Sequence, residues 1–150
     1  LDQTFDFRAP LKKHERLKNQ SKAVFPKLSK LVTQLPFEKG ELPVIKKNHD
    51  CIYLDFKTVI KPPIWRHNYL EWASGYKNVF LHAIDSIQAN KNHLANWVRF
   101  VDILYDAQVN VFCDYTDGLD QFIAKSIPMP ERTISRLRSW VFYQEKLVST

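Results

Sequence analysis

The sequence predicts an α/β fold, with a small, mostly parallel sheet and flanking helices. Apolar residues recur at helical spacing over residues 90–107, between two short β-rich runs at residues 78–84 and 109–113. This strand–helix–strand unit has the length that a right-handed parallel crossover needs. A β-rich run at residues 51–56 precedes the unit and should add a further strand to the same sheet.

The N-terminal third of the chain should be helical and basic. Residues 11–25 place apolar side chains at loosely helical spacing among lysines, and Pro26 interrupts that pattern. A second short helix should follow over residues 28–35. Pro36 and Gly40 then break the chain before the first strand.

Shorter elements should connect this segment to the crossover unit. Residues 43–49 suggest a short edge strand. The Pro62-Pro63 pair stops any strand, and residues 65–74 can then turn as a helix that ends at Gly75.

Two longer helices should cover the sheet. The first spans residues 90–107 and turns these residues inward: Leu94, Trp97, Val98, Val101, Leu104 and Tyr105. The second should open at Pro130, which is tolerated in a first helical turn, and run to about Leu147. Its inward residues should be Ile134, Leu137, Trp140 and Val141.

Length and charge indicate one domain with an uneven surface. The 150 residues, 45% of them hydrophobic, suffice for one core. Within it we distinguish a basic helical segment, residues 1–40, from an α/β part, residues 41–150. Residues 1–50 hold 11 Lys or Arg against 6 Asp or Glu, a balance of +5 within a total of +6.

The excess of positive charge defines a candidate basic patch, formed by Lys12, Lys13, Lys18 and Lys22. Such a patch could meet nucleic acid, an anionic lipid surface or an acidic protein. A solvated helix face is the simpler interpretation, because the aromatic residues that single-strand binding uses do not alternate with these lysines.

The cysteines and histidines give no sign of a metal site. Cys51 and Cys113 each lie in a β-rich run, where a free thiol behaves as a small buried hydrophobe. His49 lies near Cys51, but no paired-ligand spacing accompanies it. His82 falls inside a predicted strand, so we expect a satisfied core residue.

Targeting features are also few. No run approaches the roughly 18 apolar residues that span a bilayer, so we expect no transmembrane segment. Two free cysteines favour a reducing compartment, which would be the cytoplasm in a bacterium and the mitochondrial matrix in a eukaryote. The chain begins at Leu1 and its one methionine is Met129, so we expect a segment of a longer translation product.

An ordered series of motifs runs from about residue 42 to residue 140. The series consists of Leu42-Pro43-Val44, Ile52-Tyr53-Leu54-Asp55-Phe56, Tyr69-Leu70, Tyr76-Lys77-Asn78-Val79-Phe80-Leu81, the stretch from Phe100 to Val109, and Arg132-Thr133-Ile134-Ser135-Arg136-Leu137. In order and spacing it resembles the C-terminal part of the ZapE-type bacterial cell-division ATPases and their mitochondrial relatives. The resemblance implies that the parent protein binds ATP and Mg²⁺ and interacts with protein partners.

This chain departs from the family in two ways. It has only three glycines, Gly40, Gly75 and Gly118, and none precedes Lys-Ser or Lys-Thr, so it contains no phosphate-binding loop. We therefore expect that the chain alone needs no cofactor and hydrolyses no ATP. Its Cys113-Asp114-Tyr115 and Pro130-Glu131 replace residues usual in the family, which leaves open the alternative of a non-catalytic structural subunit in a larger assembly.

Arg132 and Arg136 are the residues that we expect to contact nucleotide or a partner. They lie one helical turn apart, so their guanidinium groups share a face, and Arg132 in the first turn opposes the helix dipole. In phosphoryl-transfer enzymes an arginine from another segment stabilises the transition state. The alternative is a salt bridge to Glu131, Asp102 or Asp106.

Four further residues are candidates for structural or coupling roles. Asp55 closes an apolar strand, as a magnesium-binding carboxylate would, yet no phosphate loop is present for it to serve. Asp102 and Asp106 share a helix face, where paired carboxylates could do acid–base work, but Arg99 is a ready partner for Asp102. Tyr105 belongs to the same motif.

Overall fold

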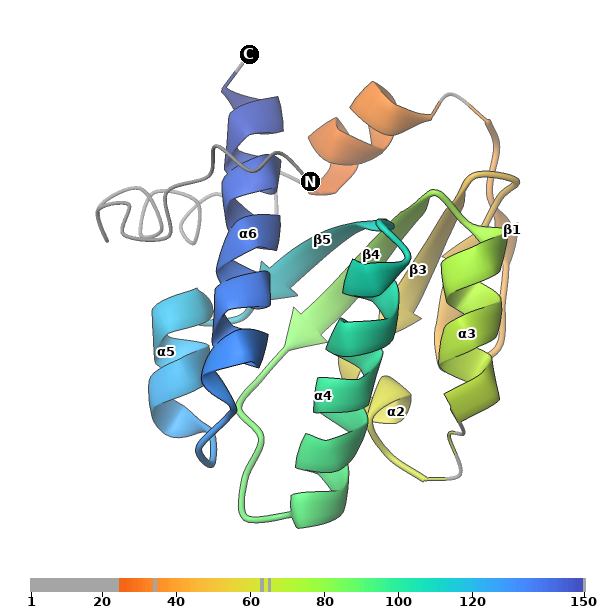
Figure 1. Ribbon diagram of the computed structural model, residues 1–150. Helices are drawn as coiled ribbons and strands as arrows, with labels where there is room; N and C mark the ends of the chain where they lie inside the picture. Colours follow the sequence, from red (N-terminus) through yellow and green to blue (C-terminus); the bar gives the residue numbers. More distant parts are fainter. Residues whose placement is uncertain (1–24, 34, 63, 65, 150) are drawn as a thin grey trace.

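The computed structural model describes residues 25–149 except 34, 63 and 65. Its centre is a five-stranded sheet in the order β1-β2-β3-β4-β5 (Figure 1). The strands are β1 (Glu38–Lys39), β2 (Val44–Lys47), β3 (Cys51–Asp55), β4 (Asn78–Ile84) and β5 (Asn110–Tyr115). The last three are parallel neighbours, whereas β1, β2 and β3 pair antiparallel. The predicted α/β class is confirmed.

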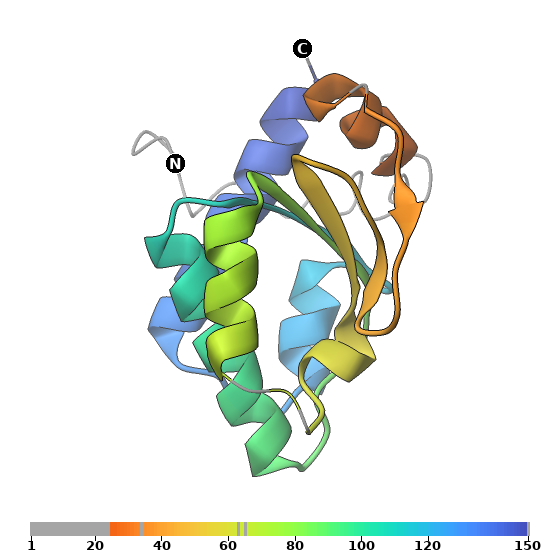
Figure 2. The same ribbon diagram turned by 90° about the vertical axis from the view of Figure 1, so that its right-hand side faces the viewer.

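Helices connect and cover the strands. They are α2 (Phe56–Val59), α3 (Arg66–Gly75), α4 (Lys91–Asp106), α5 (Leu119–Lys125) and α6 (Glu131–Val148). Residues 25–32 are also helical. The predicted crossover is present, since α4 joins the parallel neighbours β4 and β5. Helices α3 and α4 lie over one face of the sheet, and α6 runs beside β5 (Figures 1 and 2).

The other face of the sheet carries a row of aromatic rings. Tyr53, Phe80 and Phe112 lie opposite one another on the three parallel strands. The Tyr53 and Phe80 rings stack with centroids 4.4 Å apart, and Phe25 meets the Phe80 ring edge-on at 5.5 Å. Helical residues 25–32 therefore pack against this face and share one hydrophobic core with the sheet.

Local interactions explain where several elements begin and turn. The Asn90 side chain accepts hydrogen bonds from the backbone N–H groups of Asn92 and His93, which caps α4. Gly40 lies in the β1–β2 connection, where a Cβ atom would be 2.6 Å from the carbonyl oxygen of Val44. Only glycine fits that close approach.

Helix α6 also completes the hydrogen bonding of β5. The buried Gln144 accepts from the backbone N–H of Cys113 and donates to its carbonyl oxygen, at 3.0 and 3.3 Å. These two backbone groups lie on the side of β5 away from β4, so the amide of Gln144 takes the place of a neighbouring strand.

The structure corrects several predicted elements. The N-terminal helix includes Pro26 and ends at Val32, although we expected it to cover residues 28–35. The strand predicted at residues 43–49 is β2, which is not at the edge because β1 lies beyond it. Phe56 begins α2 and is not part of the preceding strand. The helices α2 and α5 were not predicted.

None of the helices within the described residues is both long and apolar enough to cross a membrane. The basic patch at Lys12, Lys13, Lys18 and Lys22 lies outside the described residues and stays a prediction.

Candidate functional site

Six of the predicted site residues lie within the described residues, and the structure brings five of them together between α4 and α6. We call the group formed by Asp102, Tyr105, Asp106, Arg132 and Arg136 the α4–α6 ionic cluster. Asp102 lies at its centre: its Oδ2 accepts a hydrogen bond from Arg132 Nη2 and its Oδ1 one from Arg136 Nη1, each at 2.9 Å. The prediction that both arginines share one helix face is therefore confirmed.

Arg136 makes the larger set of contacts. Besides Asp102, its Nη2 pairs with Asp106 Oδ1 at 3.1 Å. Its guanidinium carbon also lies 4.6 Å from the centroid of the Tyr105 ring, in a cation–π contact. The Arg136 side chain is only 16% exposed, so this arginine is committed to holding α4 against α6.

Arg132 is held far more loosely. Its side chain is 67% exposed and reaches Asp102 through one nitrogen. A guanidinium group has five N–H donors, and the contact with Asp102 uses only one nitrogen of Arg132. Of the two arginines, Arg132 is therefore the one whose guanidinium group is more accessible to solvent.

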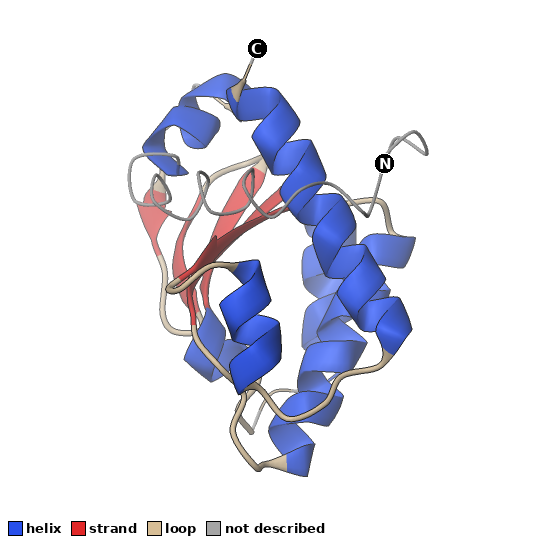
Figure 3. Ribbon diagram, turned by 90° about the vertical axis from the view of Figure 1, so that its left-hand side faces the viewer, coloured by secondary structure: helices blue, strands red, loops and turns tan. Residues whose placement is uncertain are grey.

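The pairing corrects one prediction about Asp102. We expected Arg99, three residues earlier on the same helix, to be its partner. Arg99 instead donates to Asn96 Oδ1 at 3.2 Å. The arginines of α6 reach Asp102 because α4 and α6 pack against each other (Figure 3). The alternative of a salt bridge from these arginines to Asp102 or Asp106 is therefore present in the fold.

Asp55 lies apart from this cluster, at the end of β3. Its carboxylate accepts from the backbone N–H and the side-chain hydroxyl of Thr58, at 3.2 and 3.0 Å. It therefore caps the first turn of α2. Both bonds end on Oδ2, so this oxygen is used inside the fold, which agrees with a structural role.

His82 contradicts the prediction that it is a satisfied core residue. Its side chain is 51% exposed and its Nδ1 lies 3.3 Å from Oδ2 of Asp114, which is almost buried. The reason is an irregularity in β4. Its register with β5 shifts between Leu81 and Ile84, and Ala83 has a positive φ of 59°. No signal in the sequence marks this bulge.

The cysteines are buried and free, as predicted. Burial raises the pKa of the Cys113 thiol to about 12, and burial also raises that of Cys51. Neither thiol is a nucleophile at neutral pH. No group of three or more metal-ligating side chains occurs in the part of the chain that the structure describes.

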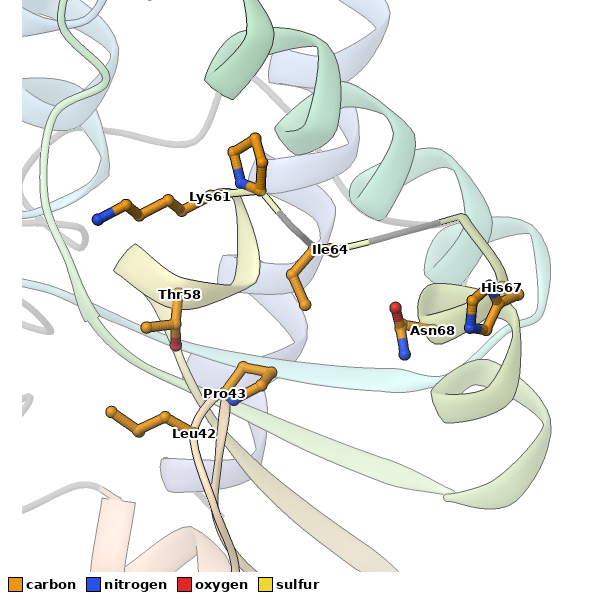
Figure 4. Close-up of a pocket in the computed structure, with 8 residues that line it drawn as sticks. Leu42, Pro43, Thr58, Lys61, Ile64, His67 and Asn68 are labelled. Carbon is orange, nitrogen blue, oxygen red and sulfur yellow. The ribbon is translucent and has the colours of Figure 1, made fainter.

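Two hollows lie near the carboxyl ends of the parallel strands, on either side of α2. One, of about 440 Å³, is lined by Leu42, Pro43, Thr58 and Lys61 and by residues that follow α2 (Figure 4). The other, of about 580 Å³, lies between α2 and the loop before α4. In open α/β sheets, ligands bind at this end of the strands.

Comparison with known proteins identifies the class to which this α/β fold belongs. A family model, AFG1-like ATPase, matches residues 2–145. The chain therefore belongs to the AFG1-like ATPase family, as the motifs between residues 42 and 140 indicated. Neither the comparison with curated proteins nor that with solved structures gave a match.

Proposed function

We propose that this chain is the C-terminal region of a ZapE-type, AFG1-like ATPase, which supports ATP hydrolysis and protein binding by its parent but does not hydrolyse ATP alone. The observation that carries the proposal is a family match over residues 2–145 in a sequence with no Gly-Lys-Ser or Gly-Lys-Thr. In P-loop ATPases that motif supplies the backbone cradle and the lysine that hold the phosphates.

The residues of this chain do not fit ATP and Mg²⁺ by themselves. No glycine-rich loop is present in the sequence, and the Asp55 carboxylate, which resembles a magnesium ligand in its place after a strand, is engaged by Thr58. We therefore derive no catalytic step from this chain. ATP and Mg²⁺ belong in our proposal to the parent protein.

Arg132 is the residue through which we propose that this region acts. It is the exposed arginine of the α4–α6 ionic cluster, and Asp102 fixes its direction without covering it. An arginine supplied to a phosphoryl-transfer site from another segment stabilises the charge that develops on the phosphate. The same geometry serves for an acidic group on a partner protein.

The test has two arms. The purified 150-residue chain should show no ATP turnover, measured by phosphate release. In the parent, Arg132→Ala should lower turnover by about 10³-fold if the residue reaches the transferring phosphate. The matched control is Arg99→Ala, an exposed arginine on α4 outside the cluster, which should leave turnover unchanged. Turnover by the chain alone would refute the proposal, and full turnover in the Arg132→Ala parent would refute the role of this residue.

A second function, a non-catalytic subunit within a larger assembly, is favoured by one observation. Both arginines already have carboxylate partners in the fold, so neither needs a phosphate. The gene sequence upstream of Leu1 separates the two proposals. A Gly-x-x-x-x-Gly-Lys-Thr motif there supports the ATPase region, and its absence supports the structural subunit. In either case we propose a reducing compartment, the bacterial cytoplasm or the mitochondrial matrix.

A further inference from the structure

A third hollow lies on the face of the sheet that α3 and α4 leave uncovered. It measures about 480 Å³ and is bounded by helical residues 25–30 on one side and by β2, β3 and β4 on the other. Figure 2 shows this helix and the sheet from the side. We call it the sheet-face hollow. Neither the family match nor the proposed function assigns it a role.

One part of its lining is apolar and aromatic. Phe25, Ile45 and Tyr53 line the hollow. The Tyr53 ring is fixed by stacking on Phe80 and by edge contacts with Phe25 and Phe37. These rings are held in place before any ligand arrives, which lowers the entropy cost of binding an apolar body.

Lys46 supplies a positive charge beside these rings. Its Nζ lies 4.4 Å from the centroid of Tyr53 and 4.7 Å from that of Phe37. Such cation–π contacts hold the ammonium group in place but leave its N–H donors available. No carboxylate pairs with Lys46 within the described residues, so its hydrogen-bonding capacity is open to an anion.

His82 is the second polar group that lines the hollow. The bulge in β4 sets His82 and Ala83 against Asp114, the residue of β5 between the partners of Leu81 and Ile84. An alanine at a φ of 59° is sterically unfavourable where glycine would not be. Strained backbone at a bulge often aims a side chain at a functional site.

Asp114 determines which nitrogen of His82 is available. Its Oδ2 lies 3.3 Å from Nδ1 of the imidazole, so Nδ1 faces the carboxylate. Nε2 takes no part in this contact and is left for a ligand. This is the arrangement that lets a histidine bind an oxyanion.

We propose that the sheet-face hollow binds a small organic anion, whose carboxylate or phosphate contacts Lys46 and His82 and whose apolar body lies against Phe25 and Tyr53. The positive charge of Lys46, which lines the hollow, favours an anion. The apolar lining favours a ligand with an aromatic or aliphatic body over a bare inorganic ion.

The proposal has two halves: the ligand needs an anionic group, and it needs an apolar body. Isothermal titration calorimetry on the 150-residue chain tests both with four probes: 2-naphthyl phosphate, 2-naphthoate, neutral 2-naphthol and inorganic phosphate. At least one naphthyl anion should bind saturably, and naphthol and inorganic phosphate should each bind at least about 10-fold more weakly. The phosphate and carboxylate arms identify the preferred anionic group. If naphthol binds as tightly as the naphthyl anions, the anionic group is not needed and that half is overturned. If inorganic phosphate binds as tightly, the apolar body is not needed and that half is overturned.

Variants then locate the site. Lys46→Met, which keeps the apolar stem, and His82→Gln should each weaken the naphthyl anion by about 10-fold or more, whereas Lys46→Arg should retain most of the affinity. Lys57→Met is the matched control, because Lys57 lines the hollow beside α2. If a variant fails to fold, amide NMR shifts of the labelled wild-type chain decide. Shifts at Ser29, Lys46 and His82 support the site, and shifts confined to residues near Lys57 overturn it.

Discussion

Arg132 and Arg136 show how burial separates two side chains with the same chemistry and the same acceptor. Both donate to Asp102 at 2.9 Å, yet one side chain is 67% exposed and the other 16%. An exposed pair is screened by water and contributes little to stability, whereas a partly buried guanidinium with several acceptors contributes more. The sequence motif presents the two arginines as equivalent, and the packing of α6 on α4 makes them different.

Removing each arginine should therefore have unequal effects on the free energy of unfolding. We expect Arg136→Met to lower it by about 1–3 kcal/mol, since Asp106 and part of Asp102 lose their partner. Arg132→Met should lower it by only about 0–1 kcal/mol. Urea denaturation measures both. Equal losses in the two variants would contradict the division of roles within the α4–α6 ionic cluster.

The two cysteine thiols should be unreactive in the folded chain. Burial raises the pKa of Cys113 to about 12, so almost none of it is thiolate at pH 8. We expect Cys51 and Cys113 to react with iodoacetamide only in denaturant, as followed by mass spectrometry of the intact protein. Rapid labelling of Cys113 under native conditions would show that β5 and α6 separate readily.

At the scale of single elements, side chains that form hydrogen bonds with backbone groups stabilise the ends of helices and the edges of strands. Gln144 is a clear case, because one buried amide satisfies two backbone groups of β5. Asn90 does the same for two N–H groups at the start of α4. An unsatisfied buried backbone group is costly, so both side chains should matter more than their size implies.

Replacing Gln144 by leucine should test this directly. The backbone N–H and carbonyl of Cys113 would lose their partner inside the protein, which costs about 1–3 kcal/mol for each group. We expect a lower urea midpoint and faster hydrogen exchange at the Cys113 amide. Gln121→Leu is the control, because Gln121 lies exposed on α5. A neutral Gln144→Leu variant would mean that another group takes over the two bonds.

The Asn90 cap of α4 should contribute less to the free energy of unfolding than Gln144 does, but its contribution should be measurable. Asn90→Ala removes the acceptor for the N–H groups of Asn92 and His93, and we expect a loss of about 1 kcal/mol in the free energy of unfolding. Asn92→Ala, on an exposed position in the first turn, is the matched control and should be nearly neutral. Thermal denaturation of the two variants side by side gives the comparison.

How far the sequence predicts this structure depends on the kind of signal. The long helix from Lys91 to Asp106 and the strands beside it follow from periodicity, which is a local property. The short elements β1, α2 and α5 have too few residues to show a period. The bulge at Ala83, which exposes His82, depends on the neighbouring strand, and the sequence did not predict it. The contact of Asp102 with the arginines of α6 was one of two alternatives that the sequence left open, and the packing of α6 on α4 decides between them.

Across the whole molecule, one hydrophobic core joins the sheet to the helices that cover its two faces. Several thiol and phenol groups are buried in this core. Burial raises the pKa of the thiols of Cys51 and Cys113 and of the phenols of Tyr53, Tyr69 and Tyr115. Each of these groups stays protonated in the folded chain at a pH where the unfolded chain loses the proton. The unfolded state then binds fewer protons, so stability falls as pH rises.

Near pH 7 these groups should therefore not change the free energy of unfolding. Above pH 9 the free energy of unfolding should decline. For Cys113 the decline begins near its unperturbed pKa of 9.0 and continues to about 12, at up to about 1.4 kcal/mol per pH unit. Urea denaturation between pH 7 and pH 11 measures the slope. Cys113→Ser is expected to flatten the part of the slope nearest pH 9, and stability that rises with pH would contradict the burial of these groups.

The two edge strands of the sheet, β5 and β1, restrict how this chain could bind a protein partner. On one side, Gln144 occupies the backbone N–H and carbonyl of Cys113, two of the groups of β5 that a further strand would need. On the other, β1 has only two residues, both charged, and short charged end strands disfavour pairing with another chain. A partner therefore cannot readily extend this sheet by β-augmentation. If the chain binds a protein partner as proposed, recognition should instead depend on side chains on helix surfaces or around hollows, and single substitutions there should change its specificity.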